Sequence, residues 1–318
     1  MTARADGDDA SVAAGGRIVV GYDESEGSRR AVRWAAVEAH RRHLVLRIVT
    51  AFGPDYIFTT DEECREYTEK VAGEAMSEAN GAAPDITVEH QGYRDLPAPV
   101  LREESRTADL LVVGSRGRGG FTGLLLGSVS RQCVHRSSCP VVVIRPPEPD
   151  DIANADAPRA GEAPHPDSSA AAGLRLVVGV DGSPSSNAAL LWAADEAEST
   201  GAVLEVIHTW EWLTSAGWAV VPSDFDPGHE AQTVLDRAIE PVRALHPGIE
   251  IAPVVAEGQA ADLLTKASEE AALLVVGCRG YGEVSGLLLG SVSDYCATHA
   301  HCPVLVMRGP RADAPDGK

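Results

Sequence analysis

The sequence contains two copies of one pattern, and this repeat limits the possible folds more than any other feature. Ile18–Ser25 recurs as Leu176–Ser183, and four later segments recur in the same order. Early pairs lie 158 positions apart and late pairs 163, which places five extra residues in the second copy, near 212–228. Two copies are too few for a solenoid, so each repeat is expected to form a domain of its own.

A proline-rich stretch separates the two copies. Residues 147–173 show no apolar periodicity and have the composition of a flexible linker. We therefore predict a disordered N-terminus at 1–16, a first domain at 17–146, a second domain at 174–309 and a tail at 310–318. At 318 residues the chain is long enough for each domain to bury its own core.

Short apolar runs alternate with segments of helical spacing in each copy. Leu110–Val113 and Leu273–Val276 are continuously apolar, as strands buried on both faces are. Five such runs alternating with helices predict a doubly wound α/β domain with a parallel sheet. The fifth runs, Pro140–Arg145 and Pro303–Arg308, begin with proline, which suits an edge strand. Ligands of such sheets bind beyond the carboxyl ends of the strands.

The charge balance narrows the class of partner. The 47 acidic residues outnumber the 27 basic ones and give a net charge of −20, which argues against binding to nucleic acid or to anionic membranes. A small phosphate ligand stays possible, because backbone N–H groups can bind it without basic side chains. The first residues lack the features of a signal peptide and no run is apolar enough to span a bilayer, so we expect a soluble cytoplasmic protein.

The most informative motif follows the fourth strand. Gly114-Ser-Arg-Gly117 is followed, after nine residues, by Gly127-Ser-Val-Ser130, and the second copy repeats this spacing from Gly277 to Ser293. The glycines allow backbone amides to approach a ligand closely. The next helix begins with N–H groups that lack intrahelical partners, and its dipole favours an anion. The pattern therefore predicts a phosphate-binding loop in each copy, with turn and packing glycines as the alternative.

Side chains around the loop fit the same interpretation. The hydroxyls of Ser128 and Ser130 add hydrogen-bond donors for phosphate oxygens, and Arg116 and Arg118 are suited to offset the remaining charge. The loop is neither a Walker motif nor a Rossmann fingerprint, because no G-x-x-x-x-G-K-[ST] occurs and the glycines follow a late strand.

The chain resembles the universal stress protein family, whose pattern G-x-x-G, nine residues, G-[ST] it matches twice. The resemblance covers nearly all of both repeats. It implies a five-stranded parallel sheet with helices on both faces, ATP bound in this loop, and an acidic residue, Asp23 or Asp181, beside the nucleotide. It also implies that the backbone of Val49 or Ile207 meets adenine, and that the two fifth strands pair so that one chain forms an internal dimer.

The expected site comprises two sets of cofactor-binding residues, with no catalytic or metal-binding residue assigned. The set in the first copy is Gly21, Asp23, Val49, Gly114, Arg116, Gly117, Arg118, Gly119, Gly127, Ser128, Val129 and Ser130. The set in the second copy is Gly179, Asp181, Ile207, Gly277, Arg279, Gly280, Gly282, Gly290, Ser291, Val292 and Ser293. Asp23 and Asp181 have an alternative role as turn or helix-cap residues, and in the ligand role they bind either a ribose hydroxyl or magnesium.

The two copies depart from the family pattern at different places. Glu24 stands where the family's Asp-Gly-Ser has glycine, and we expect it to need an ordinary backbone angle there. Glu283 replaces Gly120 of the first loop and puts a carboxylate beside the phosphates. We therefore expect two sites of unequal affinity, with the first loop the better one and Asp181-Gly182-Ser183 the better entry turn.

The function predicted from the sequence is an ATP-binding stress-response sensor or regulator, with no enzymatic activity expected. The alternatives are a slow ATPase or nucleotidyl transferase, or a nucleotide-free dimerisation scaffold. Further association into a homodimer is left open.

The six cysteines are expected to be buried free thiols. A zinc site formed by Cys296, His299, His301 and Cys302 would require these side chains to converge, which the spacing does not ensure. Trp34 and Trp192 are expected in the core, whereas Trp210, Trp212 and Trp218 suit a pocket, an interface or a packed loop.

Overall fold

The computed structural model describes residues 16–53, 60–118, 125–146, 173–212, 226–280 and 289–309. The first half consists of β1 (Arg17–Gly21), α1 (Glu26–Arg42), β2 (Val45–Ala51), α2 (Asp61–Ala82), β3 (Val88–Tyr93), α3 (Pro97–Glu104), β4 (Leu110–Gly114), α4 (Ser128–Arg136) and β5 (Val141–Ile144). The second half consists of β6 (Arg175–Gly179), α5 (Pro184–Thr200), β7 (Val203–Trp210), α6 (Pro227–Leu245), β8 (Ile251–Glu257), α7 (Ala260–Ala267), the 3₁₀ turn η2 (Ser268–Glu270), β9 (Leu273–Gly277), α8 (Ser291–His299) and β10 (Val304–Met307). The predicted alternation of strands and helices is confirmed.

Helix boundaries follow from local chemistry. Ser25 and Ser183 precede α1 and α5, and each side chain accepts a hydrogen bond from an amide of the first turn. The predicted start of α5 at Ser183-Pro184 is confirmed, since Pro184 is the first helical residue. At the other end, His43 and Gly201 adopt the left-handed conformation that ends many helices.

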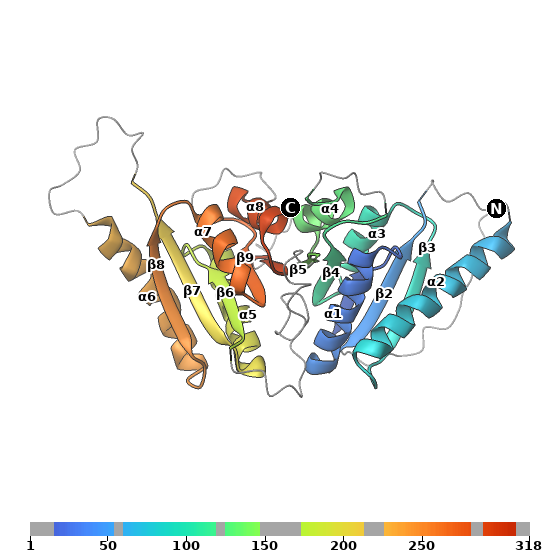
Figure 1. Cartoon of the computed structure of the whole chain (residues 1–318), viewed down its shortest axis with the longest axis horizontal. Helices are drawn as coiled ribbons and strands as arrows, with labels where there is room; N and C mark the ends of the chain where they lie inside the picture. The colour runs from blue at the N-terminus through green and yellow to red at the C-terminus, as the bar shows by residue number, and fades with distance from the viewer. Residues whose placement is uncertain are drawn as a thin grey trace, which may run out of the picture.

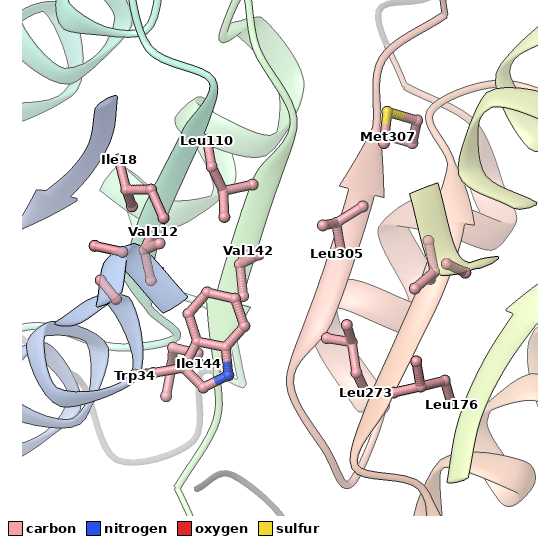
Figure 2. Packing of buried hydrophobic residues seen from close by; sticks show 14 of the residues in the cluster. Ile18, Trp34, Leu110, Val112, Val142, Ile144, Leu176, Leu273, Leu305 and Met307 are labelled. Atoms are coloured by element: carbon pink, nitrogen blue, oxygen red, sulfur yellow. The ribbon is translucent and has the colours of Figure 1, made fainter. Parts of the chain in front are cut away.

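The strands form one ten-stranded sheet in the order β3-β2-β1-β4-β5-β10-β9-β6-β7-β8. Neighbouring strands are parallel within each half, and the antiparallel pair β5–β10 joins the halves. Val142 lies opposite Leu305, its own counterpart in the repeat, so a local twofold axis passes between them. Figure 2 shows these two side chains on neighbouring ribbons, with Leu110 and Val112 on the side of Val142 and Leu273 on the side of Leu305.

Alternation along the strands divides each half into two layers. In β1, Ile18 and Val20 face the cluster that contains α1 and α2, whereas Val19 faces the cluster of α3 and α4. All three side chains are fully buried, which explains the continuously apolar sequence of the strand. Trp34 lies in the first cluster, which confirms its predicted core position, and Trp192 is partly buried and packs against that cluster.

Helices cover both faces on each side of the junction. In Figure 1, α1 and α5 flank the centre of the molecule below, and α4 and α8 flank it above. In each half the order of strands reverses between the first and fourth strands, β1 and β4 or β6 and β9. The chain leaves these two strands toward opposite faces, which opens a crevice at their carboxyl ends.

Candidate functional site

The predicted acidic residue and glycine loop meet in the first half. Asp23 accepts hydrogen bonds at Oδ1 from the amide and the hydroxyl of Ser25, at 3.2 and 2.5 Å. Its Oδ2 accepts from the amide of Arg118 at 3.0 Å. A Cβ on Gly117 would lie 2.3 Å from the same oxygen, so glycine is needed for this approach. Asp23 thus has a turn role and also lies against the loop.

The second half repeats this contact with different supporting bonds. Asp181 Oδ1 accepts from the amide of Ser183 at 3.0 Å, and a Cβ on Gly280 would lie 2.7 Å from Asp181 Oδ2. The hydroxyls of Ser183 and Ser185 both donate to the carbonyl of Arg279, which ties the entry turn to the loop. The motif spacing did not identify Ser185, because its counterpart in the first half is Gly27.

Four of the predicted site glycines have a packing role. A Cβ on Gly21 or Gly179 would lie 3.0 or 2.7 Å from a leucine of α3 or α7. A Cβ on Gly114 or Gly277 would lie 2.7 Å from backbone atoms of α1 or α5. The packing alternative therefore accounts for these positions, and any ligand contact there is made through the backbone.

The helices that follow the loops begin without a capping side chain. Gly127 precedes α4 and Gly290 precedes α8, and neither helix has a side-chain hydrogen bond at its N-cap. The amides of these glycines donate to the carbonyls of Ser115 and Cys278 at 2.7 Å, which fixes both helix starts against the strands. First-turn amides of such a helix are directed along its axis, where the dipole favours an anion.

The predicted serine donors separate into two kinds. Ser128 and Ser291 are exposed at the first position of each helix. Ser130 and Ser293 are buried, and their hydroxyls donate to the carbonyls of Gly114 and Gly277 at 2.6 and 2.5 Å. Both hydroxyl protons therefore hold the helix on the strand, which corrects the assignment of the Ser130 hydroxyl to phosphate.

A pocket with a cavity volume of about 110 Å³, open to solvent, lies at the carboxyl ends of β6, β7 and β9. The predicted residues that line it are Gly179, Asp181, Ile207, Gly277, Arg279, Gly280, Gly290, Val292 and Ser293. The remaining lining residues are Val180, Ser186, His208, Thr209, Ala260, Leu264 and Val276, which sequence reasoning did not assign to the site. His208 and Thr209 follow Ile207 on β7, and the rule that ligands meet strand ends was the signal that would have found them.

His208 brings a polar atom to this pocket. Its Nδ1 lies 2.7 Å from the carbonyl oxygen of Val180. A carbonyl oxygen only accepts, so Nδ1 carries the proton and Nε2 of the neutral ring is left as an acceptor.

The residues that the resemblance implies to contact adenine, Val49 and Ile207, are buried. Their carbonyls accept hydrogen bonds from the amides of Tyr22 and Val180 at 2.9 Å. Each carbonyl has a second lone pair for another donor.

The first half differs from the second at its entry turn. Glu24 has φ of 63°, so the expectation of an ordinary backbone angle is wrong. In this left-handed conformation Glu24 forms an ion pair with Arg118 and accepts a hydrogen bond from the hydroxyl of Tyr67. Gly182 takes the same place in the second half with φ of 80°, where glycine carries no steric cost. Arg118, predicted to offset phosphate charge, is thus paired with a carboxylate.

The remaining predicted positions lie at the surface, against the core or outside the described residues. Arg116 is exposed and Val129 is half-buried against the core. Gly119 and Gly282 lie outside the described residues, as do Gly120, Glu283 and Trp218. The rings of Trp210 and Trp212 meet edge to face at 5.9 Å.

The cysteines have a structural role in this fold. All six are buried and free. Burial raises the pKa of the Cys133, Cys139, Cys296 and Cys302 thiols to about 12. Within the described ranges, no three His, Cys, Asp or Glu side chains come together in a way that would hold a metal ion.

Comparison with known proteins identifies the family to which this chain belongs. The family model described as the universal stress protein family matches residues 16–145 and 174–308, which together are most of the chain. The chain belongs to the universal stress protein family. It is 32% identical over 303 residues to a universal stress protein of Mycobacterium tuberculosis, covering 92% of this chain and 96% of the relative. A universal stress protein of Mycolicibacterium smegmatis is 31% identical over 308 residues, with the same coverage.

A solved structure agrees with the fold of this universal stress protein. A universal stress protein from Archaeoglobus fulgidus superposes with a TM-score of 0.65 at 21% identity, covering 93% of this chain and 97% of that one. The family and the α/β fold predicted from the sequence are therefore confirmed. None of the helices that the structure describes is both long and apolar enough to cross a membrane.

Proposed function

We propose that this universal stress protein binds one adenine nucleotide in each domain, 17–146 and 174–309, with ATP as the first ligand to test. The observation that carries the proposal is the pocket at the ends of β6, β7 and β9. It joins an acidic side chain, a glycine loop and the uncapped N-terminus of α8 in one place. Nucleotide occupancy then shifts the conformation or partner affinity of a cytoplasmic stress regulator.

The residues of the second half suit the parts of a nucleotide. First-turn amides of α8, at Ser291–Ser293, are suited to the phosphates together with the loop at Gly280. Asp181 is suited to a ribose hydroxyl, because carboxylates accept from hydroxyls. The Nε2 acceptor of His208 and the second lone pair of the Ile207 carbonyl are suited to the amino group of adenine.

Calorimetric titration with ATP tests the site assignment. The test variant is Gly117→Val with Gly280→Val, which places side-chain carbon against Asp23 and Asp181. The matched control is Gly248→Val, because a Cβ at that exposed glycine meets nothing within 4 Å. We expect the control to bind like the natural chain and the double variant to bind no ATP. Two ATP molecules bound to the double variant would contradict the assignment.

The roles of magnesium and of hydrolysis need separate measurements. Titrations with and without magnesium decide whether the ion contributes, and Asp181, which lines the pocket, is the carboxylate suited to bind it. A sensor is expected to bind ATP without steady release of phosphate. Phosphate release above background that disappears in Gly280→Val would favour the ATPase alternative. Sedimentation with and without ATP tests whether further association into a homodimer occurs.

A further inference from the structure

Part of the junction between the two halves obeys the local twofold symmetry. β5 and β10 pair about the local twofold axis. Arg145 donates to the carbonyls of Ala297 and Thr298 near the end of α8, and its counterpart Arg308 donates to the carbonyl of Val134 in α4. Because these contacts are symmetric, they would suit a pair of first halves or a pair of second halves equally well.

On the α1–α5 face, two equivalent carboxylates meet at the axis. Glu38 and Glu196 occupy the same place in the two repeats, and their side chains are only 2% and 5% exposed. Arg41 contacts both carboxylates at 2.5 Å, and Arg42 contacts Glu196 at 2.7 Å and also binds Glu38. Burial and the nearby Glu38 raise the pKa of the Glu196 carboxyl, which marks the repulsion that the arginines offset.

Both of these arginines come from the first half. The second repeat has Ser199 and Thr200 at the matching places, where Ser199 accepts a hydrogen bond from Arg41. The guanidinium of Arg42 also lies 4.7 Å from the ring centre of Trp192. The two carboxylates are thus neutralised only because one partner carries the arginines.

On the α4–α8 face, equivalent residues at the axis have opposite charges. Arg131 of α4 pairs with Asp294 of α8 at 3.1 Å, and these two residues occupy the same place in the two repeats. His135 Nε2 lies 3.0 Å from the other oxygen of Asp294. On each face of the sheet, therefore, the charges of the first half complement those of the second half. The residues involved differ between the two faces.

We propose that these axial charges specify the pairing partner, so that a first half accepts a second half and neither accepts its own kind. Two second halves would bring Glu196 against Glu196 without arginine and Asp294 against Asp294. Two first halves would bring Arg131 against Arg131. A residue on a twofold axis meets its own counterpart, so like charges there repel in every self-pair. These charges make β5 pair with β10, although the apolar edge of each strand could also pair with a second copy of itself.

Charge reversal on the α4–α8 face tests this in the full-length chain. The variants are Arg131→Asp, Asp294→Arg and the double swap, and the readout is amide hydrogen exchange in β5 and β10, with β2 and β7 as internal references. Each single variant should lower protection at the junction by roughly three- to ten-fold, as expected for an exposed pair made repulsive. The double swap should restore it. The proposal would be overturned if the single variants left junction protection unchanged. It would also be overturned if protection in the double swap fell by the two single losses combined.

The buried face provides a second and larger test. Arg41→Ser with Arg42→Thr gives the first half the residues of the second and leaves Glu38 facing Glu196. Junction protection should fall by roughly 100-fold or more, the scale seen when one side of a buried ion pair is removed. Adding Glu38→Gln and Glu196→Gln to that variant should recover most of it, which a loss of packing alone would not allow. Failure of this rescue would show that charge does not set the pairing.

Discussion

Glu24 offers a way to separate backbone strain from charge in the first site. Its φ of 63° costs a residue other than glycine about 1–2 kcal/mol. Glu24→Gly removes this cost and reproduces the Asp-Gly-Ser turn of the second half. It also removes the ion pair with Arg118, whose side chain is 49% exposed, and the bond from Tyr67. An exposed pair contributes at most about 1 kcal/mol and a hydrogen bond about 1 kcal/mol.

These gains and losses are of similar size, so Glu24→Gly should leave the free energy of unfolding nearly unchanged. Glu24→Ala loses the same contacts but keeps the left-handed strain, and it should be less stable than Glu24→Gly by about 1–2 kcal/mol. Urea unfolding of the two variants measures this difference. Equal stability of the alanine and glycine variants would refute the strain argument, because only the backbone cost distinguishes them.

The same substitution has a separate effect on ligand binding. Glu24→Gly removes one negative charge from the entry turn and releases Arg118 from its carboxylate partner. One charge-assisted contact to phosphate contributes about 1.5–3 kcal/mol, so ATP binding at the first site should tighten by roughly ten- to 100-fold. The gain should disappear when Arg118→Ala is added. An unchanged isotherm for Glu24→Gly would refute the argument that the Glu24–Arg118 pair weakens the first site.

Three further predictions follow from packing and burial. Gly277→Ala should destabilise the fold by about 1–3 kcal/mol in urea unfolding, because its Cβ would lie 2.7 Å from the amide nitrogen of Ser186, whereas Gly248→Ala should not. Burial raises the pKa of Tyr22 to about 12 from 10.0, so the unfolded chain loses this proton first and stability should fall between pH 10 and 12. Tyr22→Phe should remove that part of the pH dependence. A thiol reagent at pH 8 should react with the cysteines only after unfolding, since thiolate is the reactive form; rapid reaction of the folded chain would contradict their burial.

The sequence indicates which residues lie side by side where a motif fixes the backbone path. Asp181 and Gly280 were predicted to share a site, and the fold brings them into contact because β6 and β9 are neighbours. Ser130 and Ser293 were assigned to phosphate, but a hydroxyl beside a strand-end carbonyl donates to it instead. The choice between a ligand and a neighbouring carbonyl depends on tertiary distance, which sequence spacing does not contain.

The sequence by itself determined the repeat, the order of strands and helices, the family and the position of both glycine loops. These features follow from apolar periodicity, helix caps and local backbone freedom, which act over a few neighbouring residues. Only the tertiary structure decided that Glu24 adopts a left-handed angle and pairs with Arg118, and that His208 lines the pocket. It also decided that Arg131 meets Asp294 at a local axis. Contacts of this kind join residues far apart in the chain, and their partners are fixed only once the sheet has assembled.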